Sequence, residues 1–311
     1  MIGLFGYFRG FATTSLLATC RKLSSSSLSL DLNMPPFKRF VFAWIVLSGA
    51  VYGQDAGQIV RMAIERFNHS TSVGRQYGFF ELEVQRQFDD EGKLKSERSR
   101  TFDVTMQEDS PYRRLVGRDG KPLSASENEN EVAKFHYDIE QRRRETPSQR
   151  AKRLAEWEKR QDRQRKFLRE MPEAFEFTVL REERFEGRDT WVIRALPKRD
   201  YHPPNTEGRI LSKLAGTFWI DKAELHCARL EAQSVDTLAF GWLLVRVSKG
   251  ARLTISQTRV NGEAWFPSHV FASYRARIGL IKLIVGENEY SYSNYRKLRA
   301  GSRPAVGVPG L

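Results

Sequence analysis

Alternation of apolar and polar residues dominates the last third of the chain, from Phe175 to Tyr295. Short alternating runs are separated there by polar or glycine-containing turns, such as Glu186-Gly187-Arg188-Asp189. This pattern is typical of an antiparallel meander, whose apolar face another layer must cover. The predicted strands are Phe175–Val179, Thr190–Ala195, Gly216–Asp221, Glu224–Ala232, Trp242–Val247, Arg252–Gln257, Glu263–Arg275 and Ile281–Ser291.

The stretch before the meander predicts one helix followed by two long strands. Asp55–Asn68 is amphipathic and places Ile59, Met62, Ala63 and Phe67 on one helical face. Tyr77–Phe88 alternates strictly and returns as Lys93–Met106 after a hairpin turn that ends in Gly92. The alternation places Phe80, Leu82 and Val84 on one face of the strand and Glu81, Glu83 and Gln85 on the other. A further hairpin is expected around Arg118-Asp-Gly120.

A charged insertion from Glu127 to Glu170 separates these two strand-rich parts. Its composition predicts two helices, Glu129–Glu145 and Pro147–Glu170. Thr146 suits the N-cap of the second helix, because proline follows it at the first helical position. Between Arg142 and Arg169 basic residues outnumber acidic ones. The insertion is therefore either a basic lid or membrane-facing arm, or a solvated helix pair between two segments of the sheet.

The 311 residues carry a net charge of +13, which favours anionic partners such as membrane surfaces, lipid head groups or nucleic acid. The sequence contains neither a recognisable nucleic-acid-binding motif nor aromatic residues interleaved with the basic run, so nucleic acid is disfavoured. Cys20 and Cys227 form neither a disulfide framework nor a zinc motif. Neither a metal nor another cofactor is predicted.

The first 53 residues differ from the rest of the chain. Phe37–Gly53 has a basic start, a short apolar core and small residues at its end, as secretory signal peptides do. We expect the true start at Met34, with residues 1–33 as an upstream extension. A transit peptide over Phe5–Leu30 and a lipoprotein signal at Leu17-Ala-Thr-Cys20 are the alternatives. Residues 54–300 are predicted to form a single domain, and residues 301–311, rich in Gly and Pro, a disordered tail.

Residues that would indicate an enzyme are scarce in this sequence. The five histidines, at positions 69, 136, 202, 226 and 269, are not paired at metal-ligand spacing. The nucleophile elbow, the phosphate-binding loop and the helical zinc motif are all missing. His202, in the loop Tyr201–Pro204, is the least implausible catalytic residue. The chain is therefore predicted to be non-enzymatic.

Large apolar residues are concentrated in the predicted strands. They either fill a solid core or line a cavity for an apolar ligand, since such sites are concave and mainly apolar. The candidate lining is Phe80, Leu82, Val84, Phe102, Val104, Phe177, Trp191, Ile193, Phe218, Trp219, Trp242 and Trp265. The candidate contacts to an anionic surface are Arg142, Arg143, Arg144, Lys152 and Arg153.

Two segments of the meander carry a family resemblance: Gly187-Arg-Asp-Thr-Trp-Val-Ile-Arg-Ala-Leu-Pro-Lys198 and Gly216-Thr-Phe-Trp-Ile-Asp-Lys222. A strand that ends in Pro-Lys and precedes a Trp-Ile-Asp strand, in this order of elements, resembles the outer-membrane lipoprotein-sorting (LolA/LolB-like) superfamily. The resemblance covers about Asp55 to Leu298. It implies an α+β fold: an incomplete, unclosed antiparallel β-barrel with helices covering its concave face. In that family the hollow interior takes lipoprotein acyl chains or other lipids.

These observations lead to one main hypothesis and two alternatives. The main one is a carrier or envelope sensor, exported to the periplasm or cell envelope, that binds lipid or lipoprotein acyl chains and meets an anionic membrane surface or envelope proteins. The first alternative is a periplasmic scaffold or regulatory interaction protein with a filled core. The second is an envelope hydrolase that uses His202.

Overall fold

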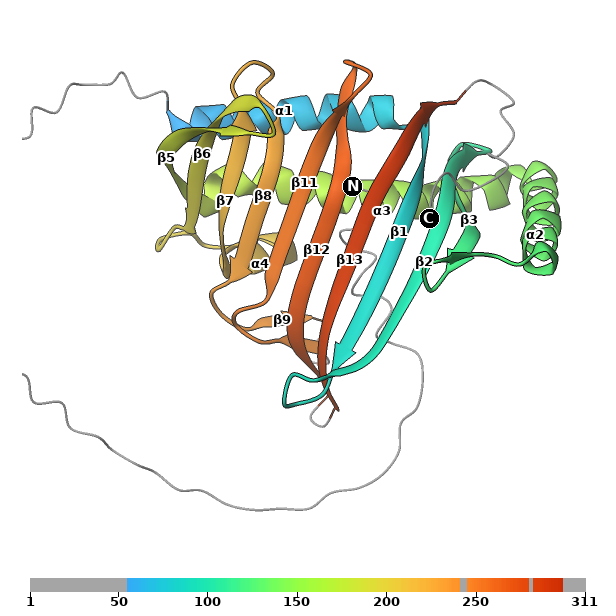
Figure 1. The fold of residues 1–311 in the computed structure, drawn as a ribbon. Coiled ribbons are helices and arrows are strands. Elements are labelled where there is room, and N and C mark those ends of the chain that lie inside the picture. Colours follow the sequence, from blue (N-terminus) through green and yellow to red (C-terminus); the bar gives the residue numbers. More distant parts are fainter. Residues whose placement is uncertain (1–54, 241–244, 280–281, 299–311) are drawn as a thin grey trace, which may run out of the picture.

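The structure, a computed structural model, describes residues 55–240, 245–279 and 282–298 (Figure 1). Within these ranges, thirteen strands form one antiparallel sheet. In chain order the strands are β1 Tyr77–Phe88, β2 Leu94–Gln107, β3 Ser110–Arg118, β4 Lys121–Pro122, β5 Phe175–Phe185, β6 Arg188–Pro197, β7 Leu214–Asp221, β8 Cys227–Ser234, β9 Leu238–Phe240, β10 Val245–Val247, β11 Arg252–Val260, β12 Ala264–Ile278 and β13 Lys282–Lys297.

The described helices all lie outside this sheet. Helix α1 precedes β1, helices α2 and α3 lie between β4 and β5, and the short α4 connects β6 to β7. Their bounds are α1 Ala56–Gly74, α2 Ala125–Arg143, α3 Pro147–Ala174 and α4 Thr206–Leu211. Among the described residues, no helix combines the length and the apolar character that crossing a membrane requires.

The strand order explains why the sheet stays open. Along the sheet the strands run β4-β3-β2-β1-β13-β12-β11-β8-β7-β6-β5, and the short β9 and β10 extend from β12. The first and last long strands, β1 and β13, pair in the middle. Strands β4 and β5 lie at opposite ends and do not pair with each other. The predicted fold class, α+β with an unclosed antiparallel barrel, is confirmed.

Helices α1 and α3 lie across the strands on one side of this sheet (Figure 1). Ile59, Val60 and Ala63 of α1 are buried in one apolar cluster with strand residues such as Phe175 and Ile193. Phe167 and Met171 of α3 pack against the same cluster. The two helices therefore cover the concave face, as the resemblance implied. The second predicted helix is not merely a solvated insertion, because its C-terminal part contributes to this core.

The register of the strands identifies which residues face these helices. Residues directly opposite each other on neighbouring strands point to the same side of a sheet. Following the pairings from β1 to β6 gives one row on the concave face: Glu83, Tyr290, Val270, Ile255, Leu230, Phe218 and Ile193. This row starts with a carboxylate and continues with large apolar or aromatic side chains.

Local sequence signals set the ends of several elements. The Thr146 hydroxyl accepts a hydrogen bond from the Gln149 backbone amide, so the predicted N-cap of α3 is confirmed. Ser124 and Glu127 form a second capping box, which starts α2 four residues before the predicted Glu129. The β5–β6 turn places Glu186 and Gly187 at positive φ, as tight hairpins of right-handed twist require.

Some of the sequence predictions fall outside the described residues. The signal peptide and the other targeting segments within residues 1–53 lie there, as do the tail 301–311 and Trp242. They remain predictions.

Candidate ligand-binding site

An apolar cavity of about 280 Å³ lies between the concave face of the sheet and helices α1, α3 and α4. Helix α1 contributes Val60, Ala63, Ile64 and Phe67, and α3 contributes Gln164, Phe167, Leu168 and Met171. On the sheet side the cavity is lined by the large-residue row, from Phe218 to Tyr290. The cavity therefore separates α1 and α3 from this part of the sheet.

Small side chains on the sheet explain why space remains beside this row. Two residues further along each strand, on the same face, the register aligns a second row: Ala195, Gly216, Ala232, Leu253, Ala272 and Asn288. All six line the cavity. Four of them are alanine or glycine, which cannot reach the helices above. The shortage of side-chain volume is therefore built into β6, β7 and β8, which are neighbours, and into β12, which is separated from β8 by β11.

Several polar groups in the cavity wall already bond to other residues of the protein. The Tyr290 hydroxyl donates to Glu83 Oε1 at 3.2 Å, and Asn288 Nδ2 donates to the Tyr274 hydroxyl at 3.4 Å. Gln257 Oε1 lies 3.2 Å from His226 Nε2. Cys227 also lines the cavity, and burial raises the pKa of its thiol to about 12, which keeps it protonated. The wall therefore offers contacts to apolar groups rather than a reactive group.

Two carboxylates face inward at the β1 end of the large-residue row. Glu81 and Glu83 are buried, yet both point to the concave side, because Glu81 pairs with Phe102 and Glu83 with Tyr290. Arg113 Nη2 contacts Glu81 and lies 3.3 Å from Glu83 Oε2, and Arg100 Nη2 is 3.2 Å from Glu83 Oε2. Burial raises the pKa of Glu81, although Arg113 opposes this.

This arrangement differs from the prediction for β1. Apolar and polar residues alternate along β1 as predicted, but Phe80, Leu82 and Val84 lie on the face away from the cavity. The sequence placed the apolar set inside because burying carboxylates is unfavourable. The guanidinium groups and the Tyr290 hydroxyl compensate Glu81 and Glu83, while Phe80 is covered by the Arg296 guanidinium at 5.3 Å.

The remaining predicted lining residues that the structure describes divide into five groups. Phe218 lines the cavity. Phe177, Trp191 and Ile193 belong to the adjacent core under α1, and Phe102 and Val104 to a separate apolar cluster on β2. Trp265 lines a second cavity. Trp219 points away from the concave face, where its Nε1 donates to Glu183 at 2.5 Å.

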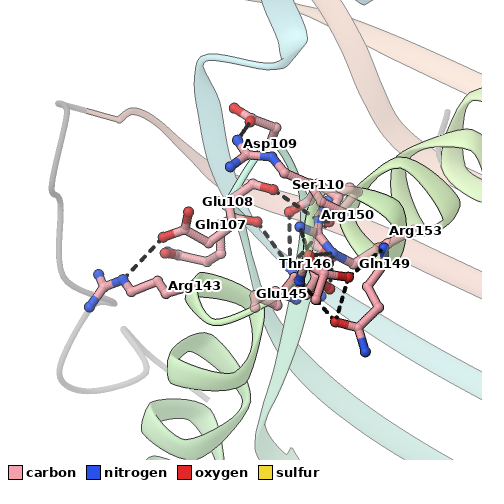
Figure 2. A network of polar contacts seen from close by, with 12 residues as sticks. Gln107, Glu108, Asp109, Ser110, Arg143, Glu145, Thr146, Gln149, Arg150 and Arg153 are labelled. Carbon is pink, nitrogen blue, oxygen red and sulfur yellow. Dashed lines mark hydrogen bonds and ion pairs between the residues drawn. The ribbon is translucent and has the colours of Figure 1, made fainter.

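Most of the predicted surface arginines instead anchor the α2–α3 corner to the β2–β3 turn. Figure 2 shows Arg143, Arg150 and Arg153 converging on the segment Gln107–Ser110. Arg153 Nη1 donates to the Glu108 carbonyl at 2.9 Å, while its Nε and Nη2 donate to Glu145 at 2.6–2.9 Å.

The other predicted basic residues also have defined surroundings. Arg142 Nη1 donates to the Gln107 carbonyl at 3.0 Å, and Arg143 Nε to Glu108 Oε1 at 3.1 Å. Arg144 pairs with Glu140 one turn away at 3.0 Å. Lys152 is the predicted residue that is exposed without an ion-pair partner among the described residues. Four of the five bases therefore have a hydrogen-bond or ion-pair partner within the protein, and of these Arg143 and Arg144 remain largely exposed.

Lys152 belongs to a larger set of basic residues that is open to solvent on α3. Lys152, Lys159, Arg163 and Lys166 are spaced by seven, four and three residues, so they share one face of the helix. All four are exposed, and within the described residues none has an ion-pair partner. This outer stripe lies opposite Trp157, Gln161 and Leu168, which face the protein interior. The helical periodicity of the basic residues was the sequence signal that could have identified it.

Catalytic or metal chemistry finds little support in the part of the chain that the structure describes. No group of three or more His, Cys, Asp or Glu side chains there could hold a metal ion. His202 is exposed in the loop after β6. His226 is buried, stacks on Trp265 at 5.3 Å, and has its pKa lowered by burial. Its surroundings are those of a core histidine.

Comparisons with known proteins give matches only among solved structures. No family model and no curated protein matches the chain. Solved structures of the LolA superfamily are among those that it resembles. An outer membrane lipoprotein-sorting protein domain from Vibrio parahaemolyticus is 11% identical over 76% of this chain and 92% of its own, with a TM-score of 0.30.

Two further structures were found in the same comparison. A LolA superfamily protein from Nitrosomonas europaea is 12% identical over 80% of this chain and 97% of its own, with a TM-score of 0.28. The MucA/MucB complex of Pseudomonas aeruginosa contains a chain that is 14% identical over 77% and 94%, with a TM-score of 0.20. Similarities this low carry no argument about function, which therefore rests on the cavity and its surroundings.

Proposed function

We propose that the chain is a non-enzymatic protein of the cell envelope that binds lipid or lipoprotein acyl chains, as a carrier or a sensor. The observation that carries this proposal is the apolar cavity between the covering helices and a row of small residues on four strands. Most of its wall is apolar, and the Tyr290 hydroxyl and the Asn288 amide already bond to other residues, so an unbranched hydrocarbon fits it without hydrogen-bonding groups.

The energetics favour such a ligand. Burying one methylene group stabilises a complex by roughly 0.8 kcal/mol. Six buried methylenes would therefore contribute about 5 kcal/mol before the entropic cost of association. The cavity is close to the lower end of the usual range for ligand sites, about 300–1,000 Å³. A single acyl chain matches this size better than a bulky ring system.

The outer stripe of α3 supports a role at an anionic membrane surface. Lys152, Lys159, Arg163 and Lys166 face outward on the same helix whose inner side covers the cavity. Basic residues near an anionic bilayer each contribute about 1 kcal/mol of attraction at low salt. Contact between the outer face of α3 and the membrane would place the cavity, which α3 covers, next to the lipids that supply the ligand.

Filling the cavity tests the proposal. Ala232→Phe places a phenyl group among Gly216, Leu230 and Leu253 and should displace two or more methylenes of a bound chain. At roughly 0.8 kcal/mol each, this loss predicts dodecanoate binding weaker by about tenfold or more in calorimetric titration. Ala155→Phe, the same change at an exposed position of α3, should leave the affinity unchanged. Equal affinity of the wild type and both variants for dodecanoate would show that its hydrocarbon chain binds outside this cavity.

A further inference from the structure

A second cavity, of about 190 Å³, lies beside the first one, under the C-terminal part of α1 and the middle of α3. The two cavities share three lining residues, Phe67, Gln164 and Gln257. A chain that passes these three residues would continue from one space into the other. The second cavity is also lined by Trp157 and Gln161, whereas the first one is almost wholly apolar.

Trp157 is the unusual residue in this wall. Its side chain is buried, with 6% exposed, and its Nε1 donor has no hydrogen-bond partner in the described structure. The Arg75 guanidinium lies 4.5 Å from the centre of the indole ring. Gln161, one turn further along α3, is also buried, with 8% exposed. A buried donor without an acceptor is unfavourable, and a ligand oxygen would relieve it.

The charged side chains around the second cavity favour an anionic ligand. Arg75 and Arg165 line it, and its described wall contains no carboxylate. Their partners, Glu158 at 3.5 Å from Arg75 and Asp162 beside Arg165, are about half exposed and lie outside this wall. Two guanidinium groups, an indole N–H and amide side chains together suit an oxyanion.

We propose that the second cavity binds the oxyanionic head group of an amphiphile whose hydrocarbon chain occupies the first cavity. Trp157 Nε1 donates to a head-group oxygen, and Arg165 provides positive charge beside it. The ligand class is a single-chain carboxylate or phosphate, such as a fatty acid or a lysophospholipid. This inference rests on the proposed function, since it assigns the other end of the same ligand.

The test compares Trp157→Phe, which keeps an aromatic ring but removes the N–H, with the matched control Trp191→Phe, a residue in neither cavity wall. The probes are dodecanoate, dodecyl phosphate and the uncharged methyl dodecanoate. Trp157→Phe should raise the Kd of at least one anionic probe about tenfold and that of the methyl ester less than threefold. Trp191→Phe should leave the Kd of the anionic probes and that of the methyl ester unchanged. Which anion shows the larger effect distinguishes a carboxylate from a phosphate ligand.

A direct readout keeps the test independent of stability. The indole N–H resonance of Trp157, assigned by its loss in Trp157→Phe, should shift downfield when the preferred anion binds and much less with the ester. Arg165→Gln should weaken the anions alone, by several-fold. If the wild type binds the probes but this resonance and these affinities stay unchanged, the inference is wrong and the proposed function stands. If it binds none of the probes, both are wrong.

Discussion

At the scale of single residues, compensation of charge decides which face of β1 is inside. Glu81 and Glu83 point into the concave side because Arg113, Arg100 and the Tyr290 hydroxyl meet them there. Alternation in a sequence shows that a strand has two faces, but the partners that tell them apart lie far away in the chain. Arg113 and Tyr290 are 32 and 209 residues from Glu81, so β1 alone could not reveal the choice.

Glu81 gives a pH-dependent prediction. Burial raises its pKa in the folded state above the ordinary value of a glutamate carboxyl group. A carboxyl group with a raised folded pKa contributes stability below its unfolded pKa, and this contribution is lost as pH rises through the folded value. Glu81→Gln keeps a neutral side chain at every pH. The stability of the wild type relative to Glu81→Gln should therefore fall as pH rises from about 4 towards neutrality.

Urea unfolding at a series of pH values measures this difference directly. Glu91→Gln, in the exposed β1–β2 turn, is the matched control and should show no such pH-dependent difference from the wild type. A wild type that gains stability over Glu81→Gln with rising pH would mean that Arg113 outweighs burial at this site.

At the scale of elements, α3 combines three tasks along its 28 residues. Its N-terminal turns are fixed to the β2–β3 turn by Arg150 and Arg153 (Figure 2). Its inner face lines both cavities, and its outer face carries the basic stripe. The start of the helix was predictable from Thr146 and Pro147, since capping is a local signal. Its position over the sheet was not, because few of its residues are apolar.

The outer stripe should control binding to anionic membranes. The variant K159Q/R163Q/K166Q removes three exposed charges, each worth about 1 kcal/mol near such a surface. Binding to vesicles that contain phosphatidylglycerol should weaken on the order of 100-fold at low salt, and the difference should shrink as salt rises. Co-sedimentation with vesicles measures it.

The control variant K93Q/K95Q/R98Q removes the same charge from the β1–β2 hairpin. It should bind vesicles nearly as well as the wild type. Equal losses in both variants would show that net charge, and not this face of α3, drives the association.

At the scale of the whole molecule, the cavity follows from the register of the sheet. The alternating strands predicted an antiparallel meander whose apolar face needs a cover, and the resemblance to the LolA/LolB-like superfamily implied that the sheet stays unclosed with helices over its concave face. The row of Ala195, Gly216, Ala232 and Ala272 could not be predicted from the sequence, because these residues come from four separate strands. Most of the aromatic residues predicted to line a cavity instead belong to packed regions beside it.

The most direct test of the central claim is to identify what the protein carries. The full chain, purified from the organism that makes it without added detergent, would be extracted with organic solvent and analysed by lipid mass spectrometry. If the first cavity holds an acyl chain, the wild type should carry stoichiometric single-chain or acyl-bearing lipid, and Ala232→Phe, but not Ala155→Phe, should carry much less. A wild-type protein that is folded and lipid-free would contradict it.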